Sequence, residues 1–304
     1  MTHEEILQRI SELKSEKNAV ILAHNYARAE VQDAADLVGD SFALSRAAVD
    51  MDADMIVFAG VRFMAESAFI LSPHKKILLP DADAGCPMAD MITVEELREA
   101  KKKYPKAAVI CYVNSSAAVK AESDICCTSA NAKEVVDSLD ADEILFIPDK
   151  NLGHSISGKT DKTIHLWNGF CPIHQQITEA DVLSAKTEHP NAVFLAHPEC
   201  RPEVLSLADG VFSTAGIIKH AASSDSPEFL IGTERAMMHK LIGDSPSKSF
   251  YPVSKYAYCA NMKMATLPSI LNALETETTV VTVPEDIRVR AEKALNRMLA
   301  AAPK

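Results

Sequence analysis

Several features that would point to common classes of function are scarce or missing in this sequence of 304 residues. Glycine occurs only 10 times, about 3% of the residues against an average near 7%. That scarcity disfavours a site built from several glycine-rich phosphate loops. No CxxC pair is present, so the close ligand spacing of a structural zinc site is missing. Apolar runs such as Ala108–Tyr112 and Val280–Val283 are far shorter than the roughly 20 residues of a bilayer span. We therefore expect no membrane partner.

The charge and the cysteines of the sequence exclude further classes of function. Lys and Arg number 31 against 42 Asp and Glu, a formal charge of −11 without a basic block, so we expect no nucleic-acid partner. The first 17 residues are charged and amphipathic and lack the apolar region of a signal peptide. Seven cysteines, an odd number in such a chain, are interpreted as reduced thiols, metal ligands or catalytic groups. We expect a cytoplasmic protein.

One plan recurs three times along the chain. Three strand-like apolar runs end in polar residues and start 89 and 84 residues apart: Ala19–Asn25, Ala108–Asn114 and Ala192–Pro198. Each run is followed by an acid with a hydroxyl residue five positions later, in the pairs Asp36 and Ser41, Asp124 and Ser129, Asp209 and Thr214. A second strand-like run follows in each copy, at Asp54–Phe58, Asp142–Ile147 and Glu228–Ile231. A repeat kept in phase this way predicts three related structural units.

A third apolar run and a cysteine complete each copy, and the cysteines Cys86, Cys171 and Cys259 are 85 and 88 residues apart. Strand-like runs alternating with amphipathic helices indicate βαβ units and parallel sheets. We predict an α/β fold with three pseudo-equivalent αβα domains whose small parallel sheets are arranged about a pseudo-threefold axis around a central cavity. The expected domains are 1–91, 92–176 and 177–304, the last including a strand-like run at Thr278–Val283 and a helix at Glu285–Leu299.

The polar ends of the first strands are the candidate binding residues. Ligands gather at the carboxyl ends of parallel strands, so three segments are expected to face one site: His24-Asn25-Tyr26, Tyr112-Val113-Asn114 and His197-Pro198-Glu199. The hydroxyls Ser41, Ser129 and Thr214 recur where helix N-termini favour anions. His197 and Glu199 are a candidate general acid/base pair, although a surface loop with a proline kink is the alternative.

The three cysteines in phase are the candidate metal ligands. Each lies at or just before an expected helix start, which favours the thiolate by lowering the thiol pKa. Three converging thiolates suit a [4Fe–4S] cluster with one open, Lewis-acidic iron better than zinc. Buried core cysteines are the alternative. Cys111 is expected in the core, and Cys126, Cys127 and Cys200 are interpreted as structural, with Cys200 nearest the site; His174 lies near the cluster or simply on the following helix.

The segment Gly153–Thr160 matches the P-loop pattern GxxxxGK[ST]. A working P-loop needs a strand directly before it and a helix directly after it. Here Asp149-Lys-Asn-Leu intervenes after the apolar run, and the strand-like Thr163–Trp167 follows. We therefore expect no nucleotide site, although nucleotide binding remains one rival function.

Segments across nearly the whole chain resemble the quinolinate synthase family. They are Ala23–Tyr26, Gly39–Ser41, Ala84–Cys86, Tyr112–Ser116, Ser123–Ser129, Pro148–Gly153, Gly169–His174, His197–Cys200, Ser213-Thr214 and Cys259–Met264. The resemblance implies three α/β domains around a cavity that holds one [4Fe–4S] cluster, ligated at the matching positions Cys86, Cys171 and Cys259. It also implies condensation of iminoaspartate (iminosuccinate) with dihydroxyacetone phosphate to quinolinate, with loss of phosphate and water, in de novo NAD biosynthesis.

The resemblance further implies a substrate-binding set at matching positions: His24, Ser41, Tyr112, Val113, Asn114, Ser129, His197, Pro198, Glu199 and Thr214. Within it, Glu199 is our hypothesis for the proton-transfer base, assisted by Tyr26 and His197. The three hydroxyls would hold carboxylates or phosphate, and an aspartate-oxidising enzyme would be a possible partner that supplies the imine. A different three-cysteine [4Fe–4S] hydro-lyase is the second rival function.

Overall fold

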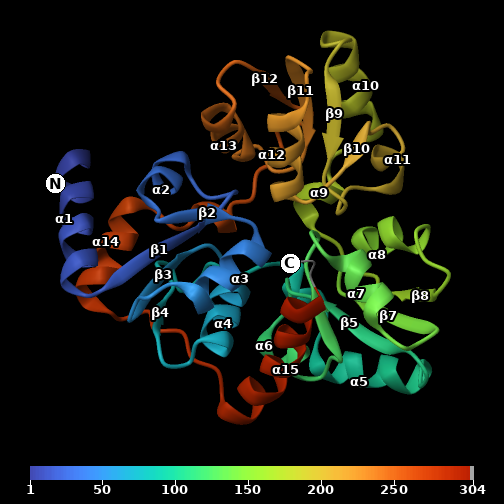
Figure 1. Ribbon diagram of the computed structural model, residues 1–304, viewed down its shortest axis with the longest axis horizontal. Coiled ribbons are helices and arrows are strands. Elements are labelled where there is room, and N and C mark those ends of the chain that lie inside the picture. The colour runs from blue at the N-terminus through green and yellow to red at the C-terminus, as the bar shows by residue number, and fades with distance from the viewer. Residues whose placement is uncertain (302–304) are drawn as a thin grey trace.

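Three α/β units surround a common centre in the computed structural model, which describes residues 1–301 (Figure 1). Each unit contains one four-stranded sheet, and all strand pairs within the sheets are parallel. The predicted α/β class with small parallel sheets is therefore confirmed. Within residues 1–301, no helix is both long and apolar enough to cross a membrane.

The first unit shows why its strands are apolar throughout. Its elements are α1 (His3–Glu16), β1 (Ala19–His24), α2 (Ala29–Ala34), β2 (Leu37–Gly39), α3 (Ser41–Asp50), β3 (Met55–Ala59), α4 (Arg62–Leu71), β4 (Lys76–Leu78) and the 3-10 turn η1 (Ala89–Met91). The strand order is β2-β1-β3-β4. Ile21 of β1 packs in one apolar cluster with Ile10, while its neighbour Leu22 packs in another with Leu44. Helices cover both faces of the sheet, so both faces of β1 need apolar residues.

The second and third units repeat this order. The second contains α5 (Val94–Lys103), β5 (Ala108–Tyr112), α6 (Ala117–Ala121), β6 (Ile125–Cys127), α7 (Ala132–Ser138), β7 (Glu143–Ile147), α8 (Lys150–Ser157), β8 (Thr163–Leu166) and α9 (Pro172–Gln175). The third contains α10 (Glu179–Glu188), β9 (Val193–Ala196), α11 (Pro202–Leu205), β10 (Gly210–Val211), α12 (Thr214–Ser223), β11 (Glu228–Gly232), α13 (Met237–Asp244), β12 (Ser249–Pro252) and η2 (Asn261–Lys263). Their strand orders are β6-β5-β7-β8 and β10-β9-β11-β12.

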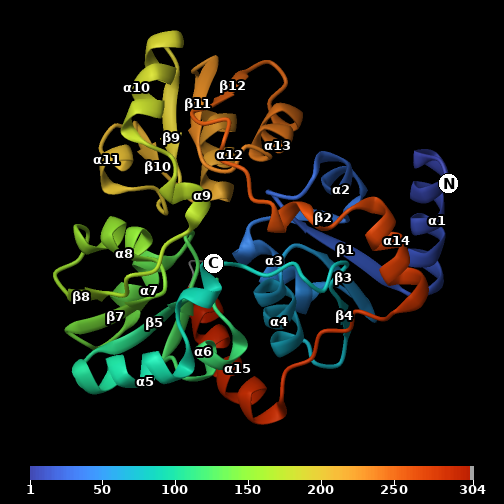
Figure 2. The same cartoon turned by 180° about the vertical axis from the view of Figure 1, so that it is seen from behind.

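Two helices at the end of the chain return to the first two units. α14 (Leu267–Thr276) packs against α1 and β3, and α15 (Glu285–Ala301) packs against α4, α6 and β6. Figure 2 shows α15 beside α6 from behind. In place of the expected strand at Thr278–Val283, the chain makes one antiparallel bridge, between Leu78 and Val280. The domain bounds 1–91, 92–176 and 177–304 stay predictions, and these contacts attach the last two helices to the first and second sheets.

The acidic residue that recurs in each copy stabilises the sheet of its own unit. Each acid lies just before a short edge strand, β2, β6 or β10, and its carboxylate accepts a hydrogen bond from a backbone amide of the neighbouring first strand. The pairs are Asp36 with Ile21 (2.7 Å), Asp124 with Val109 (2.8 Å) and Asp209 with Phe194 (2.8 Å). The five-residue interval to each hydroxyl therefore spans a short edge strand that was not predicted from the sequence.

The hydroxyl residues follow at the other end of those edge strands. Asp40 caps α3 by accepting a hydrogen bond from Ala43 N at 2.9 Å, and Ser213 caps α12 by accepting one from Gly216 N at 3.2 Å. Ser41 and Thr214 are therefore the first residues of their helices, with free amides close by. Ser129 lies in the turn that precedes α7.

Candidate active site

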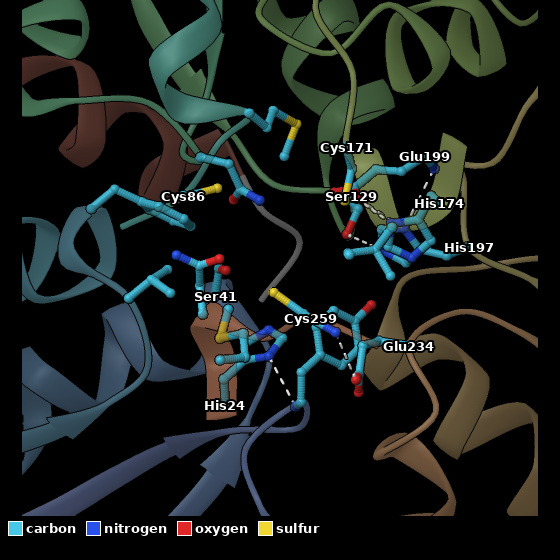
Figure 3. Close-up of a pocket in the computed structure, with 18 of the residues that line it drawn as sticks. His24, Ser41, Cys86, Ser129, Cys171, His174, His197, Glu199, Glu234 and Cys259 are labelled. Atoms are coloured by element: carbon cyan, nitrogen blue, oxygen red, sulfur yellow. Dashed lines mark hydrogen bonds and ion pairs between the residues drawn. The ribbon is translucent and has the colours of Figure 1, made fainter. Parts of the chain in front are cut away.

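A cavity lies where the three units meet, and most of the predicted site residues line it (Figure 3). Lining residues from the predicted set are His24, Tyr26, Ser41, Cys86, Tyr112, Asn114, Ser129, Cys171, His197, Glu199, Thr214 and Cys259. Val113 and Pro198 are not among the residues that line this cavity. The lining members lie at the ends of strands, at the starts of helices or in the loops between them, as expected for parallel sheets.

The three cysteines approach the cavity from three different units, and their sulfur atoms face one another across it (Figure 3). Cys171 is the residue before α9, Cys86 lies before η1, and Cys259 lies before η2. The expectation of lowered thiol pKa values is wrong for the side chains by themselves. Burial raises the pKa of Cys86 to about 12 and also raises the pKa values of Cys171 and Cys259, outweighing the nearby backbone amides. A metal charge would be needed to keep these thiols ionised.

Buried carboxyl groups hold two of the three cysteine segments. Asp149, directly after β7 and its following proline, accepts a hydrogen bond from Cys171 N with Oδ2 at 3.0 Å. Glu234, just after β11, accepts one from Cys259 N with Oε1 at 3.1 Å. Both acids are fully buried. Gly169 allows the segment before Cys171 to pass close to the second sheet, because a Cβ there would lie 2.4 Å from the Pro148 carbonyl oxygen.

Glu199 lies beside Cys171 in a group of aromatic and imidazole side chains. The Tyr112 hydroxyl donates to Glu199 Oε1 at 2.5 Å, and Nδ1 of His174 lies 2.6 Å from Oε2. Burial by itself would raise the pKa of Glu199, but His174, His197 and the Tyr112 hydroxyl hold it below its usual value. Glu199 is therefore an ionised carboxylate within a buried cavity, which is the state a general base needs.

A line of hydrogen bonds continues from His174 toward Tyr26. Nε2 of His174 lies 2.8 Å from Oγ1 of Thr233, and the Tyr26 hydroxyl lies 2.6 Å from the same oxygen. Burial and the charge of Glu199 raise the pKa of Tyr26, so its phenol stays neutral and able to donate. Glu199 and Tyr26, on different units, are thus joined through two side chains that the sequence analysis did not assign to the site.

The remaining polar groups form the rest of the wall. His24 is buried and accepts a hydrogen bond from Tyr26 N at Nδ1, and burial, with the charge of Lys263, lowers the pKa of His24 to about 3. Oγ of Ser129 lies 3.1 Å from Nε2 of His197, within hydrogen-bond distance. Oδ1 of Asn114 is buried without a hydrogen-bond partner and lines the cavity. Such an unpaired acceptor suits a ligand that donates.

Several functional side chains escaped the sequence analysis. Glu234 and Asn261 line the cavity, and Thr233 lies behind it between Tyr26 and His174. His174, which the sequence left either near the cluster or simply on the following helix, lines the cavity. Thr233 and Glu234 follow β11 directly, as Asp149 follows β7. The segments predicted to face the site all follow the first strand of a unit, but ligands also gather at the carboxyl ends of β7 and β11, where these acids and Thr233 lie.

The other cysteines and the P-loop pattern lie outside the site. Cys200 is fully buried and donates its S–H to the Gly232 carbonyl at 3.2 Å, and Cys111, Cys126 and Cys127 lie buried in β5 and β6. Gly153 is inside α8, where a Cβ would lie 2.5 Å from Leu166 Cδ2. This glycine lets the helix pack closely on β8, and its backbone is not part of a phosphate-binding loop.

Comparison with known proteins decides the family. A family model described as quinolinate synthetase A protein matches residues 8–300. The chain belongs to the quinolinate synthase family. Quinolinate synthase 2 of Methanosarcina acetivorans is 59% identical over 297 residues, covering 98% of this chain and 96% of that protein. Quinolinate synthase 1 of the same species is 57% identical over 304 residues, the full length of both chains.

A bacterial relative supports the same assignment. The quinolinate synthase of Dehalococcoides mccartyi strain 195 is 55% identical over 299 residues, covering 98% of this chain and 99% of that protein. The resemblance stated from the sequence is therefore confirmed, and the chain is an enzyme of this family, whose members serve NAD biosynthesis. The three-sheet architecture agrees with that assignment.

Proposed function

We propose that this enzyme condenses iminoaspartate with dihydroxyacetone phosphate to quinolinate, releasing phosphate and water, and that Cys86, Cys171 and Cys259 hold one [4Fe–4S] cluster. The observation that carries the proposal is the meeting of three thiols, one from each unit, in one cavity with the ionised Glu199. We further propose a cytoplasmic location, where an aspartate-oxidising enzyme would supply the unstable imine.

The chemistry of the donor set supports this cluster. Three thiols line the cavity, and the other four cysteines are fully buried elsewhere among residues 1–301. Three thiolates leave one iron of a [4Fe–4S] cluster open, and that iron supplies Lewis acidity to a bound ligand when the cluster is present. Backbone amides that follow each cysteine face its sulfur, a common way to stabilise cluster ligands.

Glu199 is our proposed general base for the carbon–hydrogen bond that breaks as the ring forms. Its carboxylate is ionised and held by Tyr112 and His174 on two sides. Because Glu199 and its neighbour His174 are buried, the carboxylate needs a partner that can carry the accepted proton away.

His174, Thr233 and Tyr26 provide that path. In each dehydration, Glu199 accepts a proton from carbon, and the neutral Tyr26 phenol gives a proton to the departing hydroxyl, which leaves as water. The proton on Glu199 then passes to Nδ1 of His174, the Nε2 proton passes to Thr233, and the Thr233 proton passes to Tyr26. Protons balance, and only the imidazole tautomer and the hydroxyl orientations change. Nδ1 and Oε2 are within ion-pair distance but not aligned as a hydrogen bond, so a small rotation of His174 completes the path.

The hydroxyls at the helix starts are our proposed anion ligands. Ser41 and Thr214 begin α3 and α12, where free amides and the helix dipole favour carboxylate or phosphate. Ser129, His24, Asn114, His197 and Tyr112 complete the proposed substrate-binding set. Val113 and Pro198 do not line the cavity, and we include them in that set only because their chain neighbours do.

The test is iron and sulfide content together with quinolinate formation, both measured without oxygen. We expect about four irons per chain in the wild type and a sharp loss in Cys86→Ser, Cys171→Ser and Cys259→Ser. Cys127→Ala, a fully buried cysteine outside the cavity, is the matched control and should keep its iron. A cluster-loaded enzyme that rejects dihydroxyacetone phosphate would instead be a hydro-lyase, and iron content indifferent to all three cysteines would refute the ligand set.

A further inference from the structure

Three donor atoms of different chemistry lie unusually close together at one edge of the cavity. Sγ of Cys171, a ring nitrogen of His174 and a carboxylate oxygen of Glu199 are all within 4.8 Å of one another. Among residues 1–301, no other group of three His, Cys, Asp or Glu side chains brings its donor atoms this close together. The three cavity cysteines do not form such a group, which suits a multi-iron cluster and not a single ion.

His174 is already arranged as a metal ligand is. Its side chain is 1% exposed, and Nδ1 has no hydrogen-bond partner although it points at Glu199. Nε2 lies 2.8 Å from the Thr233 hydroxyl, which can accept its proton and so leave the Nδ1 lone pair free. A histidine that ligates a metal through one nitrogen usually donates from the other to a fixed acceptor.

Glu199 is held in a matching way. The Tyr112 hydroxyl occupies Oε1, and Oε2 is the oxygen that faces His174. A sulfur, a nitrogen and an oxygen donor with one side open to a cavity form the ligand pattern of a three-ligand zinc site. Zinc bonds of about 2.0–2.3 Å separate tetrahedral ligands by about 3.3–3.8 Å. Side-chain shifts of about 1 Å, including a separation of Nδ1 and Oε2 from their present 2.6 Å, would therefore form the site.

We propose that, when no cluster is bound, Cys171, His174 and Glu199 form a binding site for a single zinc ion. The site shares Cys171 with the proposed cluster and includes the proposed base, so zinc and a functional cluster exclude each other. Divalent zinc binds nitrogen and sulfur donors more tightly than ferrous iron does. Zinc at this site therefore blocks cluster assembly in the newly made chain, which makes the enzyme sensitive to zinc before it is loaded with iron.

The experiment is a zinc titration of reduced, cluster-free full-length protein against a chromophoric chelator, with Co²⁺ as a spectroscopic probe. We expect one ion per chain and a cobalt–thiolate charge-transfer band from a single cysteine. His174→Ala and Cys171→Ser should weaken zinc binding at least tenfold. Cys86→Ser and Cys259→Ser should change it less than twofold, although both lose the proposed cluster. His154→Ala, an exposed histidine on α8, is the matched control.

A second measurement separates this site from the proposed cluster. Iron uptake during anaerobic reconstitution should be blocked by one equivalent of zinc in the wild type and should proceed in His174→Ala, whose three cluster cysteines are intact. Circular dichroism establishes that each variant is folded. Zinc binding that depends equally on all three cysteines and not on His174 would overturn the proposal, as would the absence of stoichiometric binding. A chain that binds zinc as expected but never takes up iron would instead refute the cluster.

Discussion

The carboxyl group of Asp149 accepts a hydrogen bond from the backbone amide of Cys171, with Oδ2 3.0 Å from the nitrogen. Glu234 makes the corresponding contact with Cys259 at 3.1 Å. In both units a buried acid that follows β7 or β11 therefore fixes the segment that carries the cysteine. The first unit differs, since Gly60 and Val61 follow β3 and the Cys86 segment is held by a backbone bond from Arg62 N to Ala84 O at 2.8 Å.

This relationship predicts that Glu234→Gln loosens the Cys259 segment. Glu234 Oε1 also accepts from Nζ of Lys263 at 2.8 Å, so the neutral amide weakens a buried ion pair as well. We expect a loss of about 1–3 kcal/mol in the free energy of unfolding and faster release of iron to a chelator. The exposed Asp52→Asn is the control. Iron release at the wild-type rate would contradict this role for Glu234.

Glu199→Gln should abolish turnover while the cluster remains. Glutamine preserves the size of the side chain but cannot accept the proton, and general-base catalysis contributes about 10²–10⁴-fold to rate. We expect kcat to fall by that factor with iron content unchanged, measured by quinolinate formation and by iron analysis on the same sample. Full activity in the variant would exclude Glu199 as the base.

Thr233→Val tests the connection between Glu199 and Tyr26. Valine has a similar shape but leaves Nε2 of His174 and the Tyr26 hydroxyl without their shared partner. We expect kcat to fall about 10²-fold with KM for dihydroxyacetone phosphate nearly unchanged. Thr233→Ser, which restores the hydroxyl, should recover most of the loss. Equal activity in the valine and serine variants would show that no proton passes through this residue.

The repeated acids should act on stability and not on catalysis. Asp124→Ala removes the acceptor for Val109 N, a bond of 2.8 Å at the edge of the second sheet. An unpaired amide of this kind costs about 1–3 kcal/mol, measurable by urea unfolding. KM and kcat below the melting range should match the wild type, and a changed KM would instead place Asp124 in the site.

Acid should destabilise the cluster-free protein through His24. Its pKa is about 3 when folded, because burial disfavours the imidazolium, against 6.5 for the ordinary side chain. Between those values the unfolded chain binds a proton that the folded chain does not, so stability is lost as the pH falls below 6.5. At pH 5 the loss is about 2 kcal/mol. Urea unfolding at pH 7 and pH 5 should show a smaller difference for His24→Asn than for the exposed His154→Asn, and identical differences would contradict the assignment.

Much of the fold was predictable because its signals are local. The apolar runs lie within short windows of sequence, and each is complete before any tertiary contact is known. The edge strands escaped notice because two or three residues carry no periodic pattern. The return of α14 and α15 to earlier units also has no local signal, since it depends on contacts more than 200 residues apart for α14 and more than 150 for α15.

The sequence by itself determined the α/β class, the threefold repetition and the choice of Cys86, Cys171 and Cys259, because repeated spacing survives without any knowledge of packing. Only the tertiary structure decided which polar residues serve the fold and which face the cavity. Asp124 pairs with its own sheet, while Glu234 supports Cys259 and His174 turns toward Glu199. The tertiary structure also decided the protonation state of each cavity thiol. Desolvation depends on all the groups packed around a thiol, and here it raises the thiol pKa more than the adjacent helix start lowers it.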